Sequence, residues 1–254
     1  MAQTNVYSVN GDVAGKVDVP AVFGTPYRPD IIKKAVLAAA ANGRQPYGPA
    51  KMAGMRHSVS TWGKGRGVAR VQRIAAGRQA TESPNNVTGR RAHPPVPERK
   101  WAMKINAKEL AIARRSALAA TGCADCAKAR GHQFDDKVSF PIVASDAVQD
   151  LKSTAEVAAF LDKIGLGYDL DRAKDGRKIR AGRGTMRNRK YKTPVSVLIV
   201  VSDREMPIFK SASNLPGVQI ECVGNLSTSV LAPGGDAGRL TVYTESAFAK
   251  IGEW

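Results

Sequence analysis

The stretch "PVSVLIVVS", residues 194–202, is the strongest indication of a fold in this sequence. It is rich in valine and isoleucine, whose branched side chains fit an extended backbone, so it predicts a β-strand. Shorter runs at 140–145 ("FPIVAS"), 218–223 ("VQIECV") and 240–244 ("LTVYT") predict three further strands. We also expect residues 166–172 ("LGYDLDR") to be extended.

Helical patterns separate these strands. The clearest is "NAKELAIARRSALAATG", residues 106–122, which begins with the capping residue Asn106 and ends at Gly122. Its expected apolar stripe consists of Leu110, Ala113, Ala117 and Leu118. A capping box, Ser153 to Glu156, predicts the start of another helix.

The two ends of the chain complete the pattern. Residues 6–20 alternate around Asn10-Gly11, which is typical of a hairpin or two short strands. Helices are predicted at 29–43, with Ile32 and Val36 on one face, and at 245–252. The alternation of strands and helices predicts an α/β fold with a mixed, largely parallel sheet covered by helices, in a Rossmann-like layer architecture.

Basic residues are concentrated in two segments of the chain. The 254 residues carry a formal net charge of +17. Residues 44–100 hold 12 Lys/Arg and 2 Asp/Glu, and residues 172–192 hold 10 Lys/Arg and one acid, Asp175. The other 176 residues hold 17 bases and 19 acids. A nearly neutral body with two basic segments predicts a polyanionic partner, because a solvated surface normally mixes the two signs.

Residues 44–100 lack any helical or strand periodicity and are rich in glycine and proline. A structureless segment of this length is unusual inside a compact domain. We therefore predict a globular α/β body made of residues 1–43 and 101–254, from which 44–100 extends as a long irregular basic loop. Running out and back, such a loop reaches at most roughly 90 Å. Residues 172–192 are predicted to form a second basic loop within the body.

The candidate RNA-contacting residues follow from these two segments, because arginine and lysine pair with phosphates and planar side chains stack on bases. In the long loop they are Arg44, Lys51, Arg56, Trp62, Lys64, Arg66, Arg70, Arg73, Arg78, Arg90 and Arg91. In the second loop they are Arg177, Lys178, Arg180, Arg183, Arg187, Arg189 and Lys190. Tyr47 is a further candidate for stacking.

Other kinds of site match the sequence poorly. The run from Gly63 to Gly67 ("GKGRG") has neither spacing of a nucleotide-binding loop, so we interpret its glycines as allowing close approach to another backbone. Cys123 and Cys126 have zinc-like spacing, but Cys222 is distant and His132 is a lone fourth candidate. We expect no metal site, no cofactor and no small-molecule substrate.

No catalytic set of residues can be assembled from the sequence. The acidic residues Glu109, Asp146 and Asp203 fall at predicted element ends, where capping explains them. The sequence contains no long apolar run, so no membrane partner is expected, and three cysteines suit a reducing cytoplasm.

Four blocks of the sequence resemble the archaeal branch of the large-subunit ribosomal protein L-four family. They are "GRRAHPP" (89–95), "RSALAATG" (115–122), "KIRAGRGTMRNRKYKTPVSVLIV" (178–200) and "LAPGGDAGRLTVYTESA" (231–247). The "GKGRGVAR" run also resembles the glycine-arginine core of that family's loop, and the similarity spans nearly the whole chain.

The resemblance implies a structural, non-enzymatic constituent of the large ribosomal subunit, located on cytoplasmic ribosomes. It implies a compact domain on the subunit surface, a long loop threaded through ribosomal RNA, and a loop tip near Trp62 to Arg73 at the wall of the peptide exit tunnel. The implied partners are large-subunit ribosomal RNA and neighbouring ribosomal proteins, including the other protein at the tunnel constriction. The alternatives are an RNA-modifying, methyltransferase-like enzyme and a free RNA-binding regulator.

Overall fold

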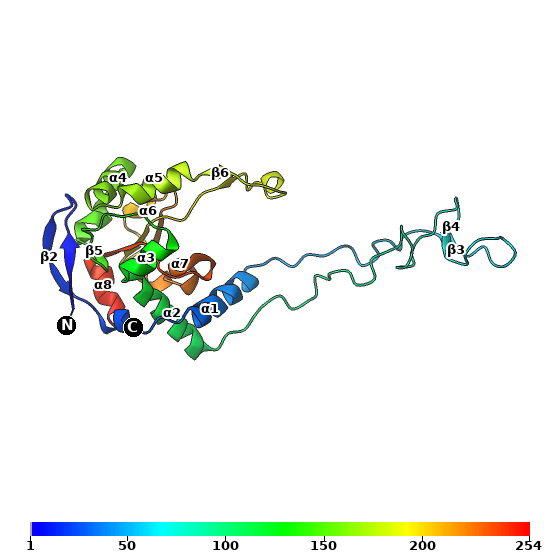
Figure 1. Ribbon diagram of the computed structural model, residues 1–254, viewed down its shortest axis with the longest axis horizontal. Coiled ribbons are helices and arrows are strands. Elements are labelled where there is room, and N and C mark those ends of the chain that lie inside the picture. Colours follow the sequence, from blue (N-terminus) through cyan, green and yellow to red (C-terminus); the bar gives the residue numbers. More distant parts are fainter. Residues whose placement is uncertain (1) are drawn as a thin grey trace. The chain divides into compact units, whose positions relative to one another are not determined.

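A computed structural model describes residues 2–254 and shows a mixed α/β fold built on a six-stranded sheet (Figure 1). In sheet order the strands are β2 (Val13–Asp18), β1 (Gln3–Tyr7), β5 (Ile142–Ala144), β10 (Thr241–Thr244), β8 (Leu198–Val201) and β9 (Gln219–Cys222). The β1–β2 pair is antiparallel and every other pair in the sheet is parallel. The predicted N-terminal hairpin and the mixed, largely parallel sheet are therefore confirmed.

Strand β8, which lies between β10 and the edge strand β9, is buried on both of its faces. Leu198 and Val200 belong to one hydrophobic cluster, whereas Ile199 and Val201 belong to a second cluster. All four side chains have no exposed surface. Because successive side chains of a strand point to opposite faces, a strand covered on both sides needs a continuous apolar run.

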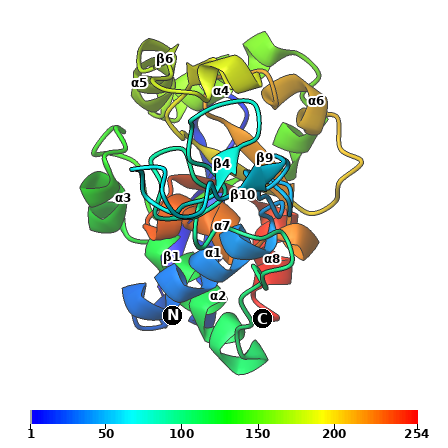
Figure 2. The same cartoon turned by 90° about the vertical axis from the view of Figure 1, so that its right-hand side faces the viewer.

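Eight α-helices lie within residues 2–254. They are α1 (Pro29–Asn42), α2 (Ala107–Thr121), α3 (Ala124–Arg130), α4 (Thr154–Lys163), α5 (Gly167–Asp175), α6 (Ile208–Ala212), α7 (Thr228–Leu231) and α8 (Glu245–Ile251). Helices α1, α2, α7 and α8 supply the first cluster, while α4 and α6 supply the second. Figure 2 shows α1 and α2 side by side, where Lys34 forms an ion pair of 2.7 Å with Glu109.

The predicted helix ends are confirmed at several positions. The Asn106 side chain accepts a hydrogen bond from the backbone N–H of Lys108, and Gly122 caps the other end of α2. Ser153 and Glu156 form the capping box that begins α4.

The expectation of a strand at 166–172 is wrong, because Gly167–Asp175 is helix α5. The buried residues there have a helical spacing instead: Leu166, Asp169 and Ala173 are all fully buried. Residues 172–175 are the last turn of α5, so the second basic loop begins only after Asp175.

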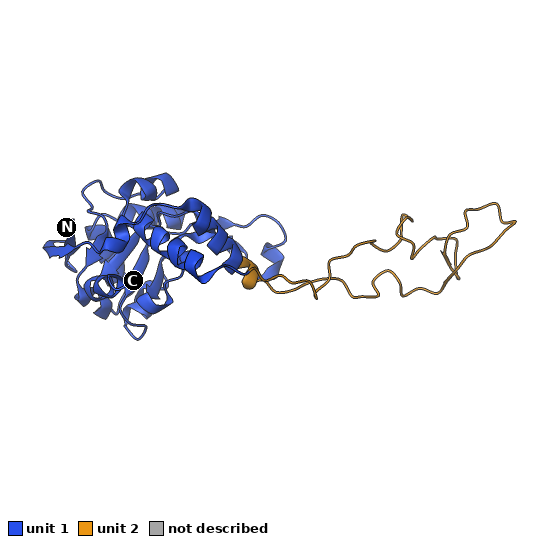
Figure 3. Cartoon of the chain, turned by 90° about the horizontal axis from the view of Figure 1, so that it is seen from below, with its two compact units in different colours: residues 1–39, 104–254 blue, residues 40–103 orange. Residues whose placement is uncertain are grey.

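Figure 3 colours two compact units. The globular unit comprises the residues up to Ala39 together with Lys104–Trp254, and the loop unit comprises Ala40–Met103. The loop unit contains a two-stranded pair, β3 (Val59–Ser60) and β4 (Arg73–Ile74). The sequence placed the division at 43/44 and 100/101. A Rossmann-like layering of the body and an RNA-threading role for the loop remain predictions.

Candidate nucleic-acid interface

The outgoing and returning segments of the loop unit lie against each other at two glycines. A Cβ atom on Gly48 would lie 2.5 Å from the carbonyl oxygen of Pro95, and one on Gly54 would lie 2.8 Å from Cβ of Arg90. Real Cβ atoms are not found so close to other heavy atoms. Glycine at these positions therefore allows the two segments to approach each other.

The glycines at 63, 65 and 67 are needed for their backbone conformation rather than for close approach of two segments. Their φ angles are +72°, +78° and +64°, a region that residues with a Cβ rarely adopt. No heavy atom lies within 4 Å of a Cβ built on any of the three. In the isolated chain they permit the backbone conformation, and the close approach to another backbone expected from the sequence remains a prediction.

Arg73, a predicted RNA contact, also holds the β3–β4 hairpin together. Its guanidinium donates to the carbonyl oxygens of Arg78, at 2.6 Å, and Ala69, at 3.3 Å. The same group lies 5.3 Å from the centre of the Trp62 ring. Arg73 and Trp62 therefore help to organise the hairpin before any partner binds.

An aromatic stack joins the two segments of the loop unit farther from this hairpin. The rings of Tyr47 and Trp101 are stacked with centroids 5.6 Å apart. The Arg44 guanidinium lies 4.4 Å from the Trp101 ring centre, and that of Arg99 lies at 5.8 Å. The sequence singled out Arg44 and Tyr47 but missed Trp101 and Arg99, whose proximity only the folded loop shows.

The second basic loop is a short hairpin. β6 (Lys178–Ile179) pairs antiparallel with β7 (Tyr191–Lys192), and the Arg180 side chain donates to the carbonyl oxygen of Arg189 at 3.0 Å. The Arg177 guanidinium lies 4.3 Å from the Tyr191 ring centre. This hairpin gathers the seven basic residues that the sequence selected here.

The predicted RNA-contacting bases have no ion-pair partner. Among residues 2–254, the ion pairs with a nitrogen–oxygen distance up to 4.0 Å involve none of them. Most of these side chains are exposed; Arg73, Arg90 and Arg180 are half-buried. Both loops therefore present positive charge that the chain itself leaves unneutralised.

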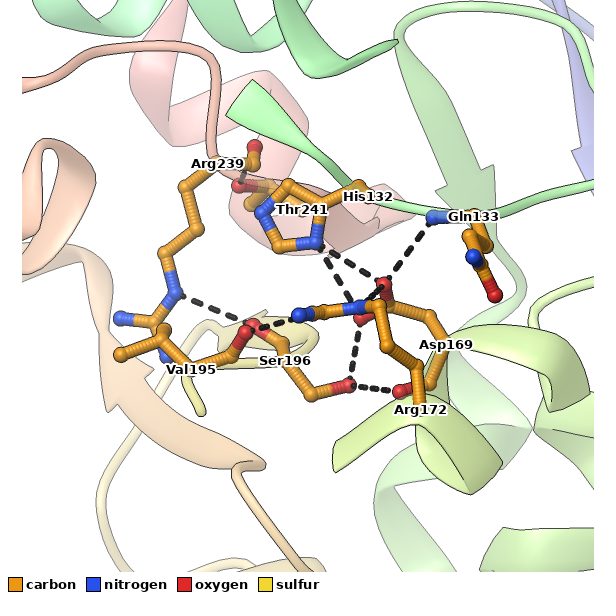
Figure 4. Close-up of polar contacts among 8 residues, drawn as sticks. All are labelled: His132, Gln133, Asp169, Arg172, Val195, Ser196, Arg239 and Thr241. Carbon is orange, nitrogen blue, oxygen red and sulfur yellow. Dashed lines mark hydrogen bonds and ion pairs between the residues drawn. The ribbon is translucent and has the colours of Figure 1, made fainter. Parts of the chain in front are cut away.

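A buried polar cluster holds both ends of the second loop (Figure 4). The carboxylate of Asp169, in α5, accepts hydrogen bonds from Arg172 at 2.9 Å and from the Ser196 hydroxyl at 2.6 Å, and its oxygens lie 3.1 Å from Nδ1 of His132. Arg172 also donates to the carbonyl oxygen of Val195 at 2.7 Å. Because Arg172 precedes the loop and Val195 follows it, the cluster fixes the separation of the two loop ends.

The same contacts set the ionisation of Asp169. Burial alone raises the pKa of this carboxyl group, but hydrogen bonds from His132, Arg172 and Ser196 outweigh burial and hold its pKa below the usual value. Nearby, the fully buried Arg239 donates to the Ser196 carbonyl oxygen, and burial lowers its pKa to about 10.

Comparison with known proteins gives concordant results. The family model described as ribosomal protein L4/L1 family matches residues 17–254. The chain belongs to this family. It is 49% identical over 251 residues to the large ribosomal subunit protein uL4 of Methanococcoides burtonii, covering 99% of this chain and 98% of the relative. The protein of the same name from Archaeoglobus fulgidus is 46% identical over 252 residues, covering 99% of both chains.

The globular unit of this family member brings a Ser, a His and an Asp together, which the sequence did not foresee. Ser196 Oγ donates to Asp169 rather than to His132, and His132 Nε2 has no hydrogen-bond partner within residues 2–254. Ser196 is fully buried. A nucleophile needs a base on its own hydroxyl and access to substrate, so this arrangement is structural rather than catalytic.

The cysteines were the other candidates for chemistry. Cys123 precedes α3 and Cys126 lies within it, and burial raises the pKa of Cys126 to about 11. Over residues 2–254, no three His, Cys, Asp or Glu side chains are grouped closely enough to hold a metal ion. In the same part of the chain, no helix is both long and apolar enough to cross a membrane.

Proposed function

We propose that this chain is a structural constituent of the archaeal large ribosomal subunit that binds ribosomal RNA through its two basic loops. Membership of the L4/L1 family and relatives named large ribosomal subunit proteins support the assignment to the subunit. The main observation in favour of RNA binding is that the Lys and Arg side chains selected in the two loops have no ion-pair partner within residues 2–254. Phosphates of folded RNA supply the missing counter-charges.

The two loops suit recognition of RNA shape and backbone. Guanidinium groups bind phosphates, and the Tyr47–Trp101 stack offers aromatic surface for an unpaired base. The glycine-rich tip, near Trp62 to Arg73, is the part that we propose reaches the wall of the peptide exit tunnel. The partners of the subunit-bound chain are ribosomal RNA and neighbouring ribosomal proteins, including the other protein at the tunnel constriction.

Sedimentation of a gentle cell lysate at low and high salt tests this function. We expect the chain to co-migrate stoichiometrically with large subunits and to survive a high-salt wash, because a threaded loop cannot leave folded RNA easily. A chain found mainly in the soluble fraction contradicts the proposal and favours a free RNA-binding regulator. Binding of labelled S-adenosylmethionine to the purified chain would instead indicate an RNA-modifying enzyme.

A further inference from the structure

A groove on the globular unit is lined by no residue of either basic loop. It has a volume of about 380 Å³ and is bounded by the first half of α2 and by residues 224–228. Its lining includes Ala107, Leu110, Ala111 and Leu226. The surface is thus mainly aliphatic, unlike that of the two loops.

Leu110 is in an unexpected position. The sequence placed it on the apolar stripe of α2 with Ala113, Ala117 and Leu118, and these three are fully buried. Leu110, by contrast, keeps 42% of its surface exposed. The stripe continues past the core of the globular unit, so the start of α2 presents aliphatic side chains that this chain leaves uncovered.

Polar groups in the groove wall lack partners. The Nε atom of Arg114 and the Oγ1 atom of Thr228 are buried and have no hydrogen-bond partner within residues 2–254, and Thr228 is 5% exposed. Arg114 stacks on Trp254, with Cζ 3.7 Å from the ring centre, and forms no ion pair in that part of the chain. Burial lowers its pKa, so its charge lacks the stabilisation that a carboxylate would supply.

We propose that this groove binds a segment of a neighbouring protein of the large subunit that presents an aliphatic side chain next to a carboxylate. The aliphatic side chain covers Leu110 and the exposed Ala111, and the carboxylate pairs with the Arg114 guanidinium. A protein fits better than RNA, because Arg114 is the only ionic residue among those lining the groove and most of the others are apolar. This inference rests on the proposed function, since it takes its partner from within the subunit.

Site-specific photo-crosslinking in purified large subunits tests the inference. The full-length chain carries benzoylphenylalanine in place of Leu110, which is exposed enough to accept it. We expect a crosslink to one ribosomal protein, at a peptide where an aliphatic residue lies beside Asp or Glu. Arg114→Gln in the same chain should lower the crosslink yield several-fold, whereas Lys108→Gln, an exposed base on the same helix, should leave it unchanged.

The outcomes separate the two proposals. Crosslinks only to ribosomal RNA, or none above a control probe at the exposed Ala249, overturn the inference while the chain remains a subunit protein. A chain absent from subunits overturns the proposed function as well. If Arg114→Gln lowers the thermal unfolding midpoint, a second variant, Arg114→Lys, replaces it in the test because lysine keeps the positive charge. We expect Arg114→Lys to retain more of the crosslink than Arg114→Gln.

Discussion

The globular unit and the loop unit differ in how far their side chains are buried and paired within the chain. In the globular unit, both faces of β8 are covered, and the ion pairs found in residues 2–254 belong to its helices and loops. In the loop unit, Thr81 is the one buried residue, and neither hydrophobic cluster includes a side chain of this unit. The globular unit has the contacts to offset its own ordering entropy, whereas we expect the loop unit to need a partner that supplies such contacts.

The largest expected effect that follows from this contrast is the salt dependence of RNA binding. If eight loop bases contact phosphate, the log–log slope of affinity against salt is roughly −6, so raising salt from about 50 to 200 mM weakens binding by about 10³–10⁴-fold. Titration of the full-length chain with large-subunit ribosomal RNA measures the slope.

Single substitutions sharpen that measurement. Arg183→Gln in the second loop should make the slope shallower by about 0.7, while Lys16→Gln on β2 should not change it. An equal change from both variants would mean that the charge of the whole chain, rather than that of the loops, controls binding.

The next effect concerns the core. Phe160, on α4, is 1% exposed within the second hydrophobic cluster, so Phe160→Ala should lower the free energy of unfolding by about 3–5 kcal/mol. Val87, in the loop unit, is fully exposed, and Val87→Ala should change the free energy of unfolding by less than about 0.5 kcal/mol. Urea unfolding followed by circular dichroism compares the two; similar losses would show that the loop unit contributes to a shared core.

The buried Asp169 predicts a loss of stability in acid. Its pKa is lower in the folded chain than in the unfolded one, so its contribution is complete above about pH 4 and is lost as the pH falls through the folded value. Asp169→Asn should cost on the order of 3 kcal/mol at neutral pH, because it leaves His132 and Arg172 without their carboxylate.

Unfolding measured from pH 7 down to acid tests this. The Asp169→Asn variant should lose less stability on acidification than the unaltered chain. Asp171→Asn, an exposed neighbour on α5, is the matched control and should behave like the unaltered chain. If the two variants have the same pH dependence, Asp169 is not the group responsible.

The smallest expected effect on folding is that of removing the loop tip. Deleting residues 60–75 takes away no side chain of either hydrophobic cluster, so the stability of the globular unit should change by less than about 0.5 kcal/mol. Incorporation into large subunits should decrease. Loss of the circular dichroism signal of the globular unit would contradict this division between the units.

Sequence reasoning succeeded where a signal is local. The apolar run of β8, the cap at Asn106 and the capping box at Ser153 each lie within one element and were found. It failed at 166–172, where so short a pattern fits a strand and a helix equally well.

The candidate RNA-binding site was predicted only in part, because only some of its features leave a local signal in the sequence. Charge counting selected the basic side chains of both loops, because charge is a property of composition. The stack of Tyr47 on Trp101 joins residues far apart in the chain, and no sequence pattern marks such a pair. The hydrogen bonds of the Arg73 side chain to the carbonyl oxygens of Ala69, before β4, and Arg78, after it, could not be predicted from the sequence either.

The sequence by itself determined the separation of charge into two basic segments, the six strands of the sheet, helices α1, α2, α4 and α8, and the family resemblance. Only the tertiary structure decided that Asp169 collects His132, Arg172 and Ser196 at the ends of the second loop, and that Leu110 remains outside the core. Periodicity and charge are read along the chain, whereas burial and hydrogen bonding depend on which distant segments the fold brings together.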